Sequence, residues 1–245
     1  MVRPVTDARR TALLIAHEPD GPGGQVTIRL EQRGFEVTTH LLTDDYDQPQ
    51  KFAPWPAFDD FDLIVLMGSV RSVADKDAIS AWIYDEIADV KRTIDADRPV
   101  LGVCFGGQVI ADAMGGSVEV SPVTEIGWFD VDSLDGAPAV LDKGPWFEWH
   151  HDRFNAPPQA EVLGVNESST QLIRIGRTVG TQFHPEVDVA HVAGFLRDAP
   201  ADYLAEVGVD PDEMMAEMRE KQAGNTERCH ALVDWYLDEV AFPAE

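Results

Sequence analysis

The chain has 245 residues and is strongly acidic, with 44 Asp and Glu against 19 Lys and Arg, which gives a formal net charge of −25 at pH 7. This charge argues against nucleic-acid or anionic-membrane binding, because contacts with phosphate need basic side chains. The length suits one or two domains with a sizeable core. Because no Pro/Ser-rich linker separates the elements, we expect one main domain over residues 1–197 and a helical C-terminal extension over 198–245 packed on it.

The first half of the chain alternates strand and helix patterns. Apolar runs predict strands at 11–16, 35–42, 63–67 and 99–103, and amphipathic runs predict helices at 23–33, 77–94 and 105–114. Such alternation is typical of a parallel sheet with helices on both faces. Further on, we expect shorter strands and turns within 118–132 and 144–154, and then a strand hairpin within 172–182.

The C-terminal extension is the least informative part. Pro211 suits the start of a helix on which Met214, Met215 and Met218 form an exposed apolar surface. Asn225 suits the N-cap of a second helix.

Cys104 lies where the strand 99–103 meets the helix 105–114. A Gly-x-Cys-x-Gly at such a joint is the thiol form of the nucleophile elbow, and Gly102 and Gly106 are needed where neighbouring backbones crowd. The sulfur then points out above the sheet, and the first amides of the helix favour a thiolate. A lone cysteine is more often buried and structural, but its setting here favours a nucleophile.

A cysteine nucleophile needs a base, and the base needs a group that orients it. The stretch Gln182-Phe-His184-Pro-Glu186 follows the predicted hairpin. We expect His184 to take the thiol proton and Glu186 to hold the imidazole in one tautomer. A His-Pro-Glu triplet is weak evidence alone and becomes strong beside the elbow.

The cysteine count and the N-terminus suggest a compartment. The chain has two cysteines, Cys104 and Cys229, and a disulfide between them would disable the nucleophile, so we expect a reducing cytoplasm. Residues 1–10 precede an apolar run that is too short for a signal peptide or a membrane span.

Together these motifs resemble the class I (triad) glutamine amidotransferases, and within them the standalone branch described as GMP synthase-like. The likeness covers about residues 10–195. The stretches that carry it are Gly102-Val-Cys-Phe-Gly-Gly-Gln108, Gln182-Phe-His-Pro-Glu186, Gly68-Ser-Val-Arg-Ser-Val-Ala-Asp75, Glu125-Ile-Gly-Trp128 and Trp149-His-His-Asp-Arg-Phe154. Two positions depart from the family pattern, which often has Gly-Gly-Pro in place of Met67-Gly68-Ser69 and usually Leu at Phe105.

The resemblance implies a flavodoxin-like three-layer α/β sandwich with a mostly parallel central sheet. It also implies that the backbone amides of Gly68 and Phe105 form an oxyanion hole, and that Gln108 contacts the substrate. Ser69 in place of Pro leaves the oxyanion loop less rigid in this interpretation. The resemblance places further substrate contacts at Ser69, Glu125, Trp149, His150 and His151.

The consecutive His150, His151 and Asp152 also invite a metal interpretation. We reject it, because consecutive side chains point in different directions and no Cys or His partner occurs at ligand spacing. We expect neither a metal nor an organic cofactor.

The expected reaction is cysteine-dependent hydrolysis of the γ-amide of glutamine, or of a γ-glutamyl compound, through a γ-glutamyl thioester. The sequence leaves open whether the protein acts alone, as a homodimer, or as an amidase subunit that delivers ammonia to a separate synthetase. A DJ-1/PfpI-like thiol hydrolase and a non-catalytic relative are weaker alternatives.

Overall fold

The computed structural model describes residues 9–244. Residues 1–8, most of the stretch considered above for a signal peptide, lie outside the described residues. The centre is an eight-stranded sheet in the order β2-β1-β3-β4-β10-β9-β8-β6. Its strands are β1 (Thr11–Ala16), β2 (Glu36–Leu41), β3 (Leu63–Leu66), β4 (Val100–Val103), β6 (Asp132–Ser133), β8 (Glu161–Val165), β9 (Thr170–Ile175) and β10 (Thr178–Thr181).

Five neighbouring strands of this sheet, from β2 to β10, run parallel. The other three pair antiparallel at one edge, beginning with the β9–β10 hairpin expected within 172–182. β3 and β4 are buried along their whole length, as continuous apolar runs in a covered parallel sheet should be. The four strands predicted in the first half are confirmed, with bounds within one residue or two.

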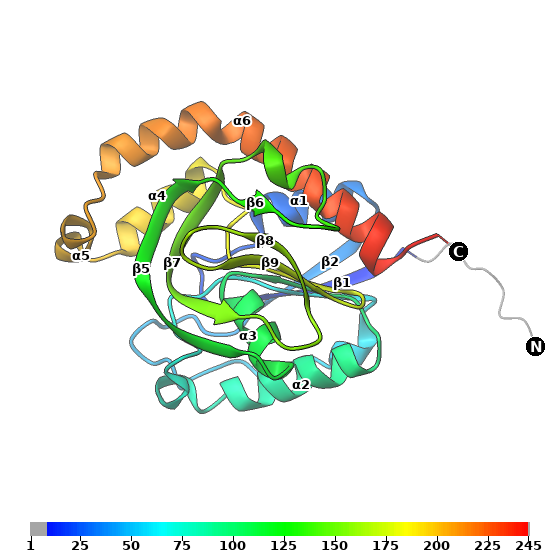
Figure 1. Ribbon diagram of the computed structural model, residues 1–245. Helices are drawn as coiled ribbons and strands as arrows, with labels where there is room; N and C mark the ends of the chain where they lie inside the picture. Colours follow the sequence, from blue (N-terminus) through cyan, green and yellow to red (C-terminus); the bar gives the residue numbers. More distant parts are fainter. Residues whose placement is uncertain (1–8, 245) are drawn as a thin grey trace, which may run out of the picture.

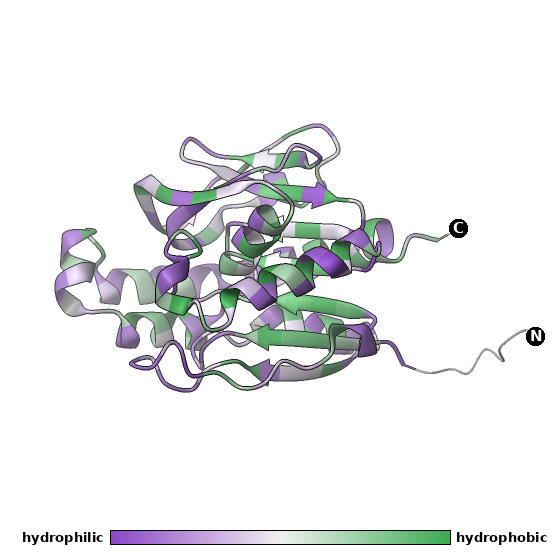
Figure 2. Cartoon of the chain, turned by 90° about the horizontal axis from the view of Figure 1, so that it is seen from below, coloured by the Kyte–Doolittle hydropathy of each residue, from purple (hydrophilic) through white to green (hydrophobic). Residues whose placement is uncertain are grey.

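Helices cover both faces of the sheet, so the predicted three-layer sandwich is confirmed (Figure 1). On one face lie α1 (Gly24–Gln32) and α6 (Pro211–Trp235), which share a core with alternate residues of β1 such as Leu14. On the other lie α2 (Ile83–Asp95) and α3 (Phe105–Ala113), which pack on Leu13 and Ile15. The central strands are accordingly among the most hydrophobic parts of the chain in Figure 2.

A second, two-stranded antiparallel sheet stands beside the sandwich. It consists of β5 (Ser117–Phe129) and β7 (Trp146–Asn155). The expectation of shorter strands and turns here was wrong, because both strands are long. They pair along almost their whole length, with one shift of register between Val120 and Glu125. Figure 1 shows this curved ribbon flanking α3. It forms one wall of the cavity described below.

The last quarter of the chain is helical, with α4 (Val189–Asp198) and α5 (Ala201–Glu206) preceding α6. Pro211 begins α6, as predicted. Asn225 is not an N-cap, because α6 runs unbroken through it, and its side-chain amide donates to Pro185 O at 3.2 Å and Val187 O at 2.9 Å. The methionine surface is also not exposed: Met214 and Met218 are buried, and Met215 is half-buried. These residues pack on Val187 and Val192, so this part of α6 covers the start of α4 and the residues before it.

The helix predicted for 77–94 is shorter than expected. Residues Lys76–Ile79 form a separate 3-10 turn, and α2 begins only at Ile83. The apolar stripe still faces the core, with Ile79, Ile83 and Val90 fully buried.

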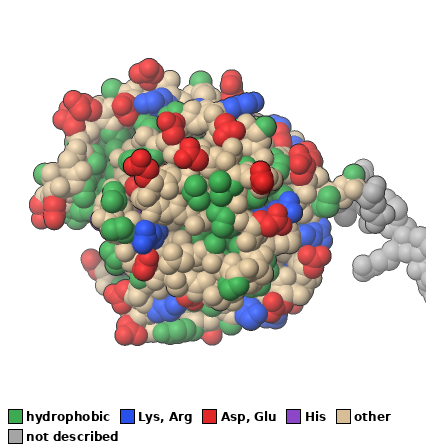
Figure 3. Space-filling view, in the orientation of Figure 1, with side chains coloured by type: hydrophobic (Ala, Val, Ile, Leu, Met, Phe, Trp, Pro, Cys, Tyr) green, Lys and Arg blue, Asp and Glu red, His purple; other side chains and the backbone are tan. Residues whose placement is uncertain are grey.

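Acidic side chains are spread over the face visible in Figure 3, with Lys and Arg among them. Within residues 9–244, no helix combines the length and apolar character that a bilayer span requires.

Candidate active site

Cys104 occupies the sharp turn between β4 and α3. Its backbone has φ 51° and ψ −106°, a strained combination for a residue with a Cβ. The glycines beside it are required by close approach. A Cβ on Gly102 would lie 2.5 Å from the Gly106 carbonyl group, and a Cβ on Gly106 would lie 2.2 Å from Leu66 O. The packing of α3 onto the sheet therefore imposes the elbow that the sequence predicted.

His184 follows β10, the strand next to β4, and since these strands run parallel their carboxyl ends bring it close to Cys104. Its Nδ1 lies 2.8 Å from Glu186 Oε1, and its backbone N–H donates to Phe147 O at 2.7 Å. A carboxylate can only accept, so Nδ1 carries a proton and a neutral ring leaves Nε2 free as an acceptor. Nε2 is buried and makes no hydrogen bond to any residue between 9 and 244.

The electrostatics of this pair favour a charged imidazole. Burial lowers the pKa of His184, but the Glu186 carboxylate and Cys104 outweigh it, and the net pKa lies well above the usual value. Cys229 differs sharply: it lies on α6, fully buried on the face that packs on the core, and burial raises the pKa of its thiol well above the usual range. A thiolate is therefore disfavoured at Cys229.

Gly68 and Phe105 frame the space above Cys104. A Cβ on Gly68 would lie 3.9 Å from Cys104 Cβ and 3.0 Å from His184 Cε1, so this glycine faces both groups. Phe105 is the first residue of α3, where the helix leaves its N–H without an intrahelical partner. Neither backbone N–H donates a hydrogen bond to any of the described residues. Both donors are available for an oxyanion.

The loop after Gly68 is held by side chains. Ser69 Oγ donates to Glu18 Oε2 at 2.8 Å and accepts from the Arg71 backbone N–H at 3.0 Å. Arg71 also binds Glu18 Oε1 at 3.2 Å and Tyr46 O at 2.6 Å. The expectation that Ser69 loosens the loop was therefore wrong, because its hydroxyl ties the loop to a buried carboxylate.

Gln108 lies one turn into α3 and is buried against the cavity. Its Nε2 donates to Asp152 O at 3.3 Å and to Gln182 Oε1 at 3.4 Å. Gln182 Nε2 in turn lies 3.6 Å from Cys104 Sγ. The two glutamines thus connect Cys104 to β7.

His150, on β7, is clamped by two buried carboxylates. Its Nδ1 lies 2.9 Å from Asp152 O, and since a carbonyl only accepts, Nδ1 carries a proton. Its Nε2 lies 3.2 Å from both Glu125 Oε2 and Glu148 Oε2. Burial lowers the pKa of His150, but Glu125 and Glu148 outweigh it and raise it to about 10. The ring is therefore an imidazolium at neutral pH.

Glu125, expected beside the substrate, lies instead behind His150. It accepts hydrogen bonds from Asn166 Nδ2 at 2.8 Å and from the Ser168 hydroxyl, and it does not line the cavity. Glu148 is fully buried, and burial raises its pKa. The ligand-capable atoms of Glu125, Glu148 and His150 lie within 4.8 Å of one another. We interpret them as an ion-pair cluster, because His150 Nε2 lies 3.2 Å from an oxygen of each carboxylate.

The neighbours of His150 alternate along β7 as a strand requires. It is the burial that alternates: Trp149 is half-buried and His151 is exposed, whereas all four residues from Trp149 to Asp152 line the cavity. The His151 ring lies 2.6 Å from the Tyr203 hydroxyl and 2.9 Å from the Thr124 hydroxyl. Asp152 is buried and accepts from the Ser72 hydroxyl.

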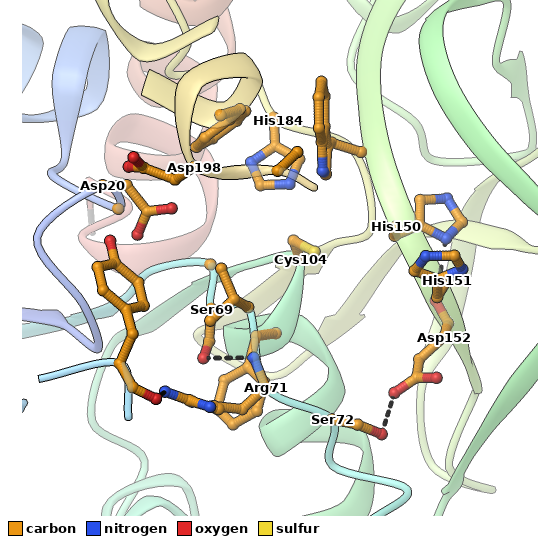
Figure 4. Close-up of a pocket in the computed structure, with 18 of the residues that line it drawn as sticks. Asp20, Ser69, Arg71, Ser72, Cys104, His150, His151, Asp152, His184 and Asp198 are labelled. Atoms are coloured by element: carbon orange, nitrogen blue, oxygen red, sulfur yellow. Dashed lines mark hydrogen bonds between the residues drawn. The ribbon is translucent and has the colours of Figure 1, made fainter. Parts of the chain in front are cut away.

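These side chains surround a cavity of about 760 Å³ that contains Cys104 and His184 (Figure 4). Sequence reasoning placed most of the centre and the β7 wall here. It missed the opposite wall, which is formed by Asp20, Tyr46, Arg71, Phe195, Arg197, Asp198 and Tyr203. These residues come from the loops after β1, β2 and β3, from the end of α4 and from α5. Apart from Arg71, which lies in the Gly68–Asp75 stretch, no motif in the sequence marks them.

The comparison with protein families agrees with this fold and site. The family profile of Glutamine amidotransferase class-I matches residues 24–193, more than two thirds of the chain. The chain belongs to the class I glutamine amidotransferase family. The family supports enzymatic activity and is consistent with glutamine hydrolysis, and the DJ-1/PfpI-like alternative is set aside.

Particular relatives place the chain within this family. It is 26% identical to the glutamine amidotransferase-like protein YfeJ of Salmonella typhimurium over 237 residues, covering 92% of this chain and 95% of YfeJ. It is 29% identical to the GMP synthase [glutamine-hydrolyzing] of Phenylobacterium zucineum over 177 residues, 67% of this chain but only 32% of that protein. A glutamine amidotransferase of Thermotoga maritima has the same fold, with a TM-score of 0.80 at 20% identity over 95% of this chain and 100% of that one.

Proposed function

We propose that the protein hydrolyses the γ-amide of glutamine or of a γ-glutamyl compound, with Cys104 as nucleophile, His184 as base and Glu186 as the residue that orients the base. The observation that carries this proposal is the strained elbow at Cys104 in one cavity with a histidine whose free Nε2 is buried and whose Nδ1 is held by a carboxylate. Few structural roles explain a backbone held at this cost beside a partnerless imidazole nitrogen.

In the first half-reaction, His184 Nε2 takes the thiol proton and Cys104 Sγ attacks the δ-carbon of the substrate amide. The N–H groups of Gly68 and Phe105 stabilise the oxyanion that forms. The C–N bond then breaks as His184 returns the proton to the departing nitrogen, which leaves as ammonia or an amine. The enzyme is left as a γ-glutamyl thioester.

In the second half-reaction, a water molecule gives its proton to the same Nε2 and attacks the thioester carbon. The C–S bond breaks, glutamate leaves, and the proton restores the thiol. The sum is one amide and one water converted to glutamate and ammonia or amine. No electron transfer is involved.

Substrate positioning is assigned to the β7 side of the cavity. Gln108, Trp149, His150 and His151 line it, and they are the candidates for contact with the α-amino and α-carboxylate groups of the substrate. Ser69 acts here through the loop it ties rather than by contact with substrate, and Glu125 acts through His150.

The direct test is the release of ammonia from glutamine, and of amine from a γ-glutamyl dipeptide, by the purified protein. Acid-quenched wild-type protein should carry a γ-glutamyl adduct by mass spectrometry, and Cys104→Ala protein should not. An adduct on any residue other than Cys104, or turnover that survives Cys104→Ala, contradicts the proposal.

A second candidate is an amidase subunit that supplies ammonia to a synthetase. It is favoured by the GMP synthases among the relatives, of which this chain spans about a third of the length. The match to YfeJ argues against it, because this chain covers 95% of YfeJ, which leaves no room in YfeJ for a separate synthetase domain. Negligible turnover by pure protein that cell extract restores would establish the subunit role, and fast dipeptide cleavage would favour the free-standing hydrolase.

A further inference from the structure

The cavity is larger than glutamine requires. Its volume of about 760 Å³ lies within the range of roughly 300–1,000 Å³ typical of pockets for drug-sized ligands, whereas glutamine has only ten non-hydrogen atoms. Figure 4 shows how the space divides around Cys104 and His184. His150, His151 and Asp152 lie on one side, and Asp20 and Asp198 lie on the other. Only one of these two sides is needed to hold the glutamyl part of a substrate.

The position of His184 shows which side receives the leaving group. The nitrogen that departs must take its proton from Nε2, the buried ring atom without a partner among the described residues. The His184 ring packs against the Phe195 ring of α4, with centroids 5.8 Å apart. The last residue of α4 is Asp198, which also lines the cavity. A substituent on the departing nitrogen therefore runs along the end of α4 toward Asp198 and Asp20.

This side of the cavity carries a net negative charge. Asp198 is paired with Arg197, at 2.8 Å and 2.6 Å. Asp20 makes no ion pair within 4.0 Å to any basic group in residues 9–244. The remaining cation of this wall, Arg71, is already bound by Glu18. Two carboxylates thus face one available guanidinium.

Tyr46 completes this side. Burial and then the neighbouring Asp20 carboxylate raise the pKa of Tyr46, so the phenol stays protonated beside an anion. Its hydroxyl oxygen is buried and makes no hydrogen bond to any of the described residues. A carboxylate, a phenol and a nearby aromatic ring, Phe195, form the surroundings that an alkylammonium group prefers.

We propose that Asp20, Tyr46 and Asp198 form a leaving-group subsite, and that the preferred substrates are γ-glutamyl amides whose amine carries a second, positively charged amino group. The proposal rests on the proposed function. The chemistry is unchanged: the amide C–N bond breaks, the thioester C–S bond forms, and the proton from His184 leaves with the diamine. The chain's net charge of −25 also favours the approach of cationic over anionic substrates.

The test compares three amides of similar size that differ in the charge at the far end. They are the γ-glutamyl amides of 1,4-diaminobutane, of n-pentylamine and of 4-aminobutyrate. For the wild-type protein, kcat/KM should be about two- to fivefold higher for the cationic than for the neutral amide, as one partly exposed charge pair provides. It should be lowest for the anionic amide.

Two variants locate the effect. Asp20→Asn should bring the cationic-to-neutral ratio close to one. Asp44→Asn removes the same charge from an exposed side chain outside the cavity, and should keep the wild-type ratio. Equal rates for the cationic and neutral amides, a preference for the anionic amide, or equal changes in the two variants would overturn the proposal.

The outcome is separable from failure of the proposed function. If no amide, glutamine included, is hydrolysed, the proposed function has failed, and the subsite is then tested by binding alone. Titration calorimetry of Cys104→Ala protein with the same three amides should give the tightest Kd for the cationic one. Equal Kd values for the cationic and neutral amides overturn the subsite.

Discussion

The centre of the cavity and its β7 wall are built in different ways. The centre stands on the ends of adjacent parallel strands: Gly68 follows β3, Cys104 follows β4 and His184 follows β10. The β7 wall stands on a separate antiparallel ribbon, and its key residue, His150, is fixed by carboxylates from both strands of that ribbon. In the centre, backbone geometry positions the reacting groups, whereas in the wall, buried charge does.

This difference predicts how each region responds to substitution. A change in the centre should remove chemistry and leave the fold intact, because the strained and partnerless groups there add little stability. A change in the wall should first cost stability, because it leaves a buried charge without its partner.

The largest effect should come from Cys104→Ala, which removes the nucleophile. Turnover should fall by about 10⁴-fold or more, with the melting temperature unchanged or raised. The matched control is Cys229→Ala, which should keep kcat and lower the melting temperature, because the Cys229 side chain is fully buried between α6 and the core. Steady-state kinetics and calorimetry check both. Loss of turnover in the Cys229 variant at a temperature where it remains folded would contradict the assignment.

His184→Ala and Glu186→Gln should be unequal. The first removes the base and should abolish nearly all turnover, whereas the second keeps a hydrogen-bond acceptor near Nδ1 and should leave a measurable remnant. Glu186→Gln should also lower the pKa of His184, because the carboxylate is the main group that raises it. The ascending limb of kcat/KM against pH would report that shift. Equal residual rates in the two variants would refute the arrangement.

The sequence predicted the centre well because the centre is local. The Gly-x-Cys-x-Gly turn and the His-Pro-Glu triplet each fit within a few residues, and adjacent parallel strands then bring them together. The wall was harder to predict. Glu125 lies opposite His150 only because β5 and β7 pair in one particular register, and Glu148 is two residues before His150 on β7. The sequence predicted shorter strands here and so did not predict this register. The prediction for Asn225 was wrong because its partners are also distant in sequence. Its side-chain amide does not cap a helix but donates from the middle of α6 to the carbonyls on either side of Glu186.

Gly68→Ala tests the proposed oxyanion hole in the centre of the cavity. The new Cβ would lie 3.0 Å from His184 Cε1, so either the ring or the loop must shift. Since loss of one oxyanion donor costs on the order of 10²–10³ in kcat, displacing the Gly68 amide should cost about 10–10³-fold, with a smaller change in KM. Comparison of kcat and KM on glutamine checks this. A pure KM effect would mean that Gly68 contacts the ground-state substrate instead.

His150→Gln tests the wall. Removing one partner of a buried charge cluster should cost about 3–5 kcal/mol of unfolding free energy near neutral pH. The pKa of His150 is about 10 in the folded protein against 6.5 as its ordinary value, so its stabilisation is complete below pH 6.5 and is lost as the pH rises toward 10. Urea unfolding of the wild-type and His150→Gln proteins at several pH values should therefore show a difference in unfolding free energy that becomes smaller above pH 6.5. His151→Gln, at the exposed neighbour, is the control and should show no such narrowing; a gap independent of pH would exclude an imidazolium at His150.

Ser69→Ala should have the smallest effect, and it decides whether the oxyanion loop is preformed. The hydroxyl ties the loop to Glu18, so its loss should cost about 1 kcal/mol of stability and lower kcat several-fold through a less fixed Gly68 amide. Burial raises the pKa of Glu18 and the Ser69 hydrogen bond lowers it, so the variant should raise that pKa further. Ser69→Thr keeps the hydroxyl and should restore most of the rate. A free-standing hydrolase needs this tie. If kcat of the pure protein is the same with and without the hydroxyl, and rises only when cell extract is added, the loop is ordered by a partner and the subunit role gains its support.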